Sequence, residues 1–157
     1  MRKTLILLSI FFLVSCKTKK GATETAITEK RTAVVLKPEE VDNAKKSRAY
    51  DLGKRVLEAC NTSRFKAFTP TEATPKVIAN ATAEKISATC RKIILRNGKF
   101  IGLNLIEVIY NEVDNEYLFR YDIKYEKTLF KRELRVTINS ENKVSALSTK
   151  EIKTKPL

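Results

Sequence analysis

A change in the spacing of apolar residues at Gly98 constrains the fold of this chain more than any other feature. Before Gly98, apolar residues recur at steps of three and four, which is the period of a helix with one buried face. After Gly98 they alternate with polar residues, which is the period of a strand with one buried face. We therefore expect the helices to precede the strands.

Two helices are expected in the first half of the chain. The first runs from about Glu39 to Cys60, because Pro38 suits a first helical turn. Its buried face comprises Ala49, Leu52, Gly53, Val56 and Cys60. The second runs from an N-cap at Thr82 to Gly98, with Ile86, Cys90, Ile93, Ile94 and Asn97 at helical spacing. Between the helices we expect a loop with one short helical turn, from which Phe65 and Phe68 fill the core.

The second half of the chain predicts three or four antiparallel strands. The clearest has Tyr117, Phe119, Tyr121, Ile123 and Tyr125 on one face, alternating with Arg120, Asp122, Lys124 and Glu126. In the strand before it, the apolar parity changes between Leu105 and Ile106, which a β-bulge would explain. Phe130 to Ile138 forms the next strand and Val144 to Leu147 a possible fourth. The predicted fold class is α+β, with two N-terminal helices packed on the apolar face of a curved antiparallel sheet of three or four strands.

Helices followed by a long, bulged meander resemble the NTF2-like, or cystatin-like, group of cone-shaped domains. The residues Gly98-Lys99-Phe100, leading into the first long strand, contribute to the resemblance, which covers about Pro38 to Thr149. It implies a cone that can enclose a pocket. It implies little about function, because fold does not determine chemistry.

The first 15 residues have the composition and order of an export signal. Basic Arg2 and Lys3 precede an apolar run from Leu5 to Val14, which is about half of the ~20 residues that a membrane-spanning helix needs. An uncleaved anchor and an ordinary secretory leader are the alternatives.

The end of this segment, Leu13-Val14-Ser15-Cys16, resembles the lipobox of bacterial lipoproteins. The resemblance implies cleavage between Ser15 and Cys16, transfer of diacylglycerol to the Cys16 thiol, and acylation of the new amine. Lys17, where an aspartate would resemble an inner-membrane retention signal, favours the outer membrane facing the periplasm in a cell with two membranes.

These features divide the chain into four parts. They are a lipoprotein signal peptide (1–15), a lipidated flexible tether (16–37), a single α+β domain (38–150) and a polar C-terminal end (151–157). Within the tether, Val34-Val35-Leu36 is the one apolar run, and the alternative is that it docks on the domain as an extended piece.

The formal net charge of +13 bears on the partners of the chain. Loss of Arg2 and Lys3 with the leader lowers the 31 basic residues to 29, against 18 acidic residues, which leaves about +11. For an exported protein we expect no nucleic-acid partner. Anionic headgroups or lipopolysaccharide fit the charge better, and solubility alone is the alternative.

Cys60 and Cys90 are predicted to form a disulfide, since both lie on apolar helix faces of a domain exported to an oxidising compartment. The alternative is two buried thiols that never meet. We expect no metal site and no cofactor, because the chain has no histidine and two thiols fall short of a zinc ligand set.

The absence of histidine also removes the usual general base, so the leading hypothesis is a non-enzymatic binding domain in the cell envelope. It would bind a small apolar ligand, an envelope polymer or a partner protein. A second hypothesis is an accessory subunit of an envelope complex. A third is a small enzyme using a tyrosine and a carboxylate, for which the candidates are Tyr110, Tyr117, Tyr121, Tyr125 and Asp122. Asp122 is predicted on the opposite face of its strand, so no catalytic residue is assigned.

Overall fold

The computed structural model describes residues 33–152; Ser15, Cys16 and residues 17–32 of the predicted tether lie outside them. Five strands form one open antiparallel sheet in sequential order: β1 (Ala33–Leu36), β2 (Phe100–Asn111), β3 (Glu116–Tyr125), β4 (Lys131–Ile138) and β5 (Val144–Ile152). The helical elements are a 3-10 turn, η1 (Pro38–Glu40), and the helices α1 (Asn43–Thr62), α2 (Pro75–Asn80) and α3 (Ala83–Asn97). The predicted α+β class and the antiparallel sheet are confirmed.

Two details of the predicted fold are wrong. The sheet has five strands rather than three or four, and the helices are not N-terminal to it, because β1 precedes them. The run Val34-Val35-Leu36 pairs with the end of β2, with Leu36 opposite Val108. Such a short run shows no period of its own, and its partner lies far along the chain, so the sequence pattern could not settle its pairing.

The ends of the long helix follow from local capping. The prediction began it at about Glu39, but α1 begins at Asn43 because the Asp42 carboxylate accepts a hydrogen bond from the Ala44 backbone N–H. The residues before it form η1 instead. At its other end the helix continues to Thr62 and stops at Ser63, which has a positive φ of 55°.

The predicted second helix is α3. The Thr82 hydroxyl accepts from the Lys85 N–H, as an N-cap does, and Gly98 ends the helix with a φ of 75°. A Cβ atom at Gly98 would also lie 3.0 Å from Glu126 Cβ, so the backbone angle favours glycine and the space is tight.

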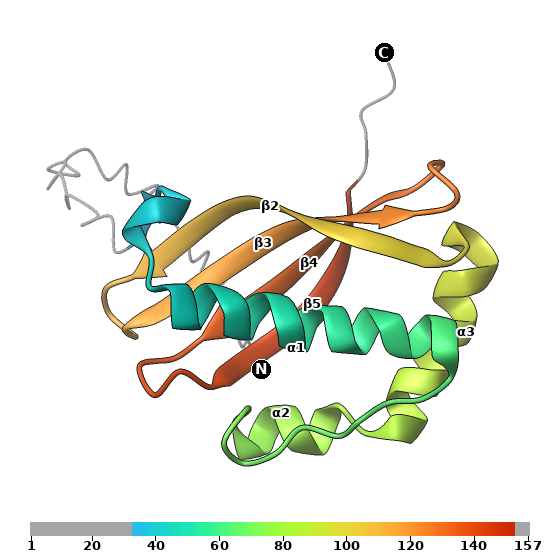
Figure 1. Cartoon of the computed structure of the whole chain (residues 1–157), viewed down its shortest axis with the longest axis horizontal. Coiled ribbons are helices and arrows are strands. Elements are labelled where there is room, and N and C mark those ends of the chain that lie inside the picture. Colours follow the sequence, from blue (N-terminus) through green and yellow to red (C-terminus); the bar gives the residue numbers. More distant parts are fainter. Residues whose placement is uncertain (1–32, 153–157) are drawn as a thin grey trace, which may run out of the picture. The chain divides into compact units, whose positions relative to one another are not determined.

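The core lies between α1 and one face of the sheet, across which α1 runs (Figure 1). Its largest fully buried apolar side chains are Phe119, Leu52, Leu57, Leu134, Ile138, Val108, Val136 and Val144. Phe68 is buried and Phe65 packs beside the core, as predicted. Among residues 33–152, all buried residues of this cluster lie between Val41 and Val144.

Strand β2 contains two irregularities, between Phe100 and Gly102 and between Leu105 and Glu107. The second confirms the predicted bulge. The side chains of Ile101 and Ile106 are 67% and 48% exposed, because each is the extra residue of a register shift and turns outward. Among residues 33–152, no helix is long and apolar enough to cross a membrane.

Candidate functional site

The predicted disulfide is present and joins α1 to α3. Cys60 lies in the last turns of α1 and Cys90 in the middle of α3, thirty residues apart in sequence, and both are buried. The bond fixes the position of α3 relative to the helix that crosses the sheet.

A groove of about 640 Å³ lies between α1 and α3, with the disulfide as part of its wall. The rest of the wall is formed by apolar Ala59, Ile94 and Leu95, the hydroxyls of Ser63 and Ser87, and Arg91. Arg91 is exposed and makes no ion pair with any other residue of 33–152. The groove therefore offers an apolar wall and one uncompensated positive charge.

The space between α1 and the sheet, where a cone would hold a ligand, is filled by side chains. Leu52 and Leu57 of α1 and Phe119 and Leu134 of the sheet are fully buried there. The groove between the helices is a hollow outside this core, and the hydrophobic periods of the sequence could not indicate it.

The candidate tyrosines do not meet a carboxylate. Tyr121 and Tyr125 lie on the buried face of β3, where burial raises the pKa of both phenols, that of Tyr125 to about 12. Tyr110 and Tyr117 stack with ring centroids 4.7 Å apart. Asp122 lies on the other face of β3 and pairs with Lys124. Within residues 33–152, no phenol is hydrogen-bonded to a carboxylate.

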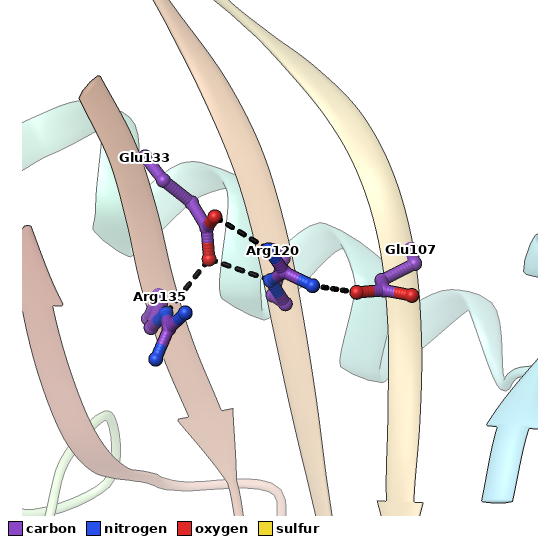
Figure 2. A network of polar contacts seen from close by, with 4 residues as sticks. All are labelled: Glu107, Arg120, Glu133 and Arg135. Carbon is purple, nitrogen blue, oxygen red and sulfur yellow. Dashed lines mark hydrogen bonds and ion pairs between the residues drawn. The ribbon is translucent and has the colours of Figure 1, made fainter. Parts of the chain in front are cut away.

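The face of the sheet opposite α1 carries a network of four charged side chains that spans β2, β3 and β4 (Figure 2). Arg120 donates from Nε and Nη2 to the two carboxylate oxygens of Glu133, at 2.6 Å each, and Arg135 donates to the same carboxylate at 2.7 Å. A third Arg120 nitrogen, Nη1, pairs with Glu107. The side chain of Glu133 is only 1% exposed.

The chemistry of this network is that of a fixed ion pair. The hydrogen bonds from Arg120, with a further contribution from Arg135, lower the pKa of Glu133 to about 2 although burial opposes the shift. The same contacts raise the pKa of Arg120. Glu133 and Arg120 are therefore ionised at neutral pH, and the network ties three strands together. Opposite charges at paired and diagonal strand positions were the sequence signal for it.

Within residues 33–152, no group of three His, Cys, Asp or Glu side chains is arranged to hold a metal ion. Comparison of the chain with protein-family models, with curated proteins and with solved structures found no match.

Proposed function

We propose that this chain is a membrane-anchored lipoprotein of the cell envelope whose domain binds a small apolar ligand without chemical conversion. The leader and the lipobox-like Leu13-Val14-Ser15-Cys16 support the anchor. The disulfide between Cys60 and Cys90 supports folding in an oxidising compartment. A long helix across a bulged antiparallel meander supports a domain of the NTF2-like or cystatin-like type.

The groove between α1 and α3 is the observation that carries the binding proposal. Its volume of about 640 Å³ falls in the range of small-molecule sites. Ala59 and Ile94 would contact an apolar body, and Arg91, free of any ion pair within the described residues, would attract an anionic group. The ligand we propose is therefore an apolar molecule with one acidic end, such as a long-chain carboxylic acid.

Filling the groove tests this function. We expect a fluorescent long-chain carboxylic acid to bind the wild type, and Ser87→Trp to abolish binding because the indole occupies the groove. Ala88→Trp is the matched control, since Ala88 is exposed on the same helix and does not line the groove. Equal binding by the wild type and Ser87→Trp would contradict the proposal.

The anchor has its own test. Cells expressing the wild type are expected to incorporate labelled palmitate into the protein, and cells expressing Cys16→Ala are not. An intact mass that retains residues 1–15, or an unmodified Cys16, would refute the anchor and leave the groove experiment unaffected.

A second candidate function is an accessory subunit of an envelope complex, favoured by the free edge of β5. Among residues 33–152, this strand pairs with β4 on one side, and on its other side only Val144 is bridged, by Ala73. A hollow of about 240 Å³ beside it is lined by Val77, Ala81, Ile86 and Leu147 among others. An extended segment of a partner could add a strand here.

Site-specific photocrosslinking in cells tests this candidate. A probe at Ala146, on the edge of β5, is expected to capture one defined protein that a probe at the exposed Val113 does not capture. The same set of nonspecific neighbours at both positions would rule this role out.

A further inference from the structure

One end of the domain exposes large aliphatic side chains among lysines. We call it the basic tip and define it as residues 95–101, from the end of α3 into β2, together with residues 124–131, from the end of β3 to the start of β4. Leu95, Ile101 and Leu129 are 77%, 67% and 83% exposed there. A side chain of this kind in water is unfavourable by itself, so three on one small surface call for a partner.

The basic tip is a fixed surface, because hydrogen bonds join its two segments. The Lys127 backbone N–H donates to Asn97 O at 2.9 Å, and the Glu126 N–H donates to Lys99 O at 3.0 Å. Lys127 Nζ also donates to Leu95 O at 3.1 Å. Figure 1 shows the β3–β4 connection close to the end of α3.

The side chains around the aliphatic residues are mainly basic. Arg96 and Lys124 pair with Glu151 and Asp122, whereas three exposed lysines, Lys99, Lys127 and Lys131, make no ion pair with a described residue. The one acidic residue inside the tip is Glu126, and its carboxylate accepts the Lys99 N–H at 2.9 Å. The tip therefore carries positive charge that nothing in residues 33–152 neutralises.

The opposite end of the sheet provides a contrast. The turn between β2 and β3 exposes Val113, with a side chain that is 72% accessible, but it carries Glu112, Asp114 and Glu116 and no basic residue. Exposed aliphatic residues thus occur at both ends of the domain, and the β2–β3 turn around Val113 lacks the lysines that surround those of the basic tip.

We propose that the basic tip binds an anionic lipid surface. Leu95, Ile101 and Leu129 enter the boundary between headgroups and acyl chains, and Lys99, Lys127 and Lys131 contact the headgroups. A membrane surface is the partner that satisfies both kinds of side chain at once. A nucleic acid or another acidic polymer would satisfy the lysines and leave the aliphatic side chains in water.

The tip can reach the membrane that would hold Cys16. The N-terminal segment joins the sheet at Ala33, which pairs with Asn111, at the end of β2 away from the tip. The twelve residues of β2 span about 40 Å at ~3.3 Å each. The segment from Cys16 to Ala33 can extend to about 60 Å, so a domain anchored at Cys16 can lie with its tip on the same surface.

Vesicle flotation tests the proposal without the anchor, using a chain that begins at Lys17 and retains the whole core. We expect binding to vesicles of phosphatidylglycerol mixed equally with phosphatidylcholine, and none to phosphatidylcholine alone. Leu129→Ser should weaken binding about tenfold. Lys127→Gln with Lys131→Gln should weaken it about twentyfold or more, at about fivefold per lysine.

Two matched controls lie at the other end of the domain. Val113→Ser removes an equally exposed aliphatic side chain, and Lys45→Gln with Lys143→Gln removes the same charge beside the β4–β5 turn. Both should bind within twofold of the wild type. Thermal melts of every variant would separate unfolding from loss of binding.

Three results would overturn the proposal: no binding by the wild type, equal loss in the control and tip lysine pairs, or unchanged binding by Leu129→Ser. A solvent-sensitive fluorophore at Leu129→Cys gives a second readout, since a chain that begins at Lys17 lacks Cys16 and retains Cys60 and Cys90, which are bonded to each other. We expect its emission to shift to the blue on anionic vesicles, and the same label at Val113→Cys to remain unchanged. Because Cys16 is absent, failure here leaves the anchor and the groove untouched.

Discussion

Gly53 of α1 lies directly against Leu134 of β4. A Cβ atom at Gly53 would be 2.6 Å from Leu134 Cδ2 and 3.2 Å from Val136 Cγ2. Gly53 is a helical residue without a positive φ, so space rather than backbone conformation requires the glycine. The missing side chain lets the middle of α1 approach the sheet closely.

Gly53→Ala is therefore expected to lower the free energy of unfolding, although alanine is the better helix former. The gain in helix propensity is about 1 kcal/mol, whereas displacing the fully buried Leu134 costs about 1–3 kcal/mol. Urea denaturation would measure a net loss of about 1 kcal/mol. Ser47→Ala, at an exposed position of the same helix, should be neutral or slightly stabilising. If Gly53→Ala is as stable as the wild type, the prediction is wrong and α1 can move away from the sheet without a loss of stability.

Removing the disulfide should destabilise the domain strongly. The bond closes a loop of thirty residues, which corresponds to about 3–4 kcal/mol in the chain-entropy model. Thermal unfolding of Cys60→Ala with Cys90→Ala should therefore occur well below that of the oxidised wild type. Reduction of the disulfide should lower the unfolding temperature of the wild type by a similar amount and leave the unfolding temperature of the double variant unchanged.

The two partners of the buried ion pair should respond unequally to substitution. Arg120→Met leaves the Glu133 carboxylate buried with Arg135 alone, at a cost of about 2–4 kcal/mol. Glu133→Gln leaves arginines that water can reach, at a cost of about 1 kcal/mol. Chemical denaturation of the two single variants and the double variant measures the coupling energy between Arg120 and Glu133. An equal loss of stability in Arg120→Met and Glu133→Gln would contradict this account.

Acid should destabilise the domain in a defined range. Hydrogen bonds from Arg120 lower the pKa of Glu133 to about 2, and those from Arg55 do the same for Glu72. A lowered pKa in the folded state means that the stabilisation is complete above the unfolded pKa of about 4.3 and is lost as the pH falls towards about 2. Urea midpoints measured down this range should fall, and Glu72→Gln with Glu133→Gln should flatten the decline. With no histidine in the chain, stability should vary little between about pH 6 and 8.

Local signals in the sequence were sufficient for several elements. The Thr82 hydroxyl and Gly98 delimit α3, because an N-cap and a glycine with a positive φ both act within one turn of the helix. The alternation in β3 predicted its buried face, and the change of parity at Leu105 predicted the bulge. The disulfide followed from two cysteines on buried helix faces.

Features that depend on distant neighbours were not predictable in the same way. The segment from Val34 to Leu36 forms a strand only by pairing with the end of β2. Glu133 can be buried only because Arg120 of the adjacent strand neutralises its charge. The outward turn of Ile101 needs the first irregularity of β2, which shows no change of parity in the sequence. The groove depends on the angle and position at which α1 and α3 cross. Predicting the disulfide from the sequence does not give this geometry.

The short β1 strand determines how the domain would respond to mechanical load. A pull applied at Ala33 acts first on β1, which is paired with β2 along four residues, Ala33 to Leu36. Tension along the strand would shear these pairs first, well before it reached α1 or the crosslinked helices. Detachment of β1 would add its four residues to the length of chain between the membrane and the domain. It would also expose the edge of β2 from Val108 to Asn111. We therefore expect β1 to separate under tension while the core remains folded.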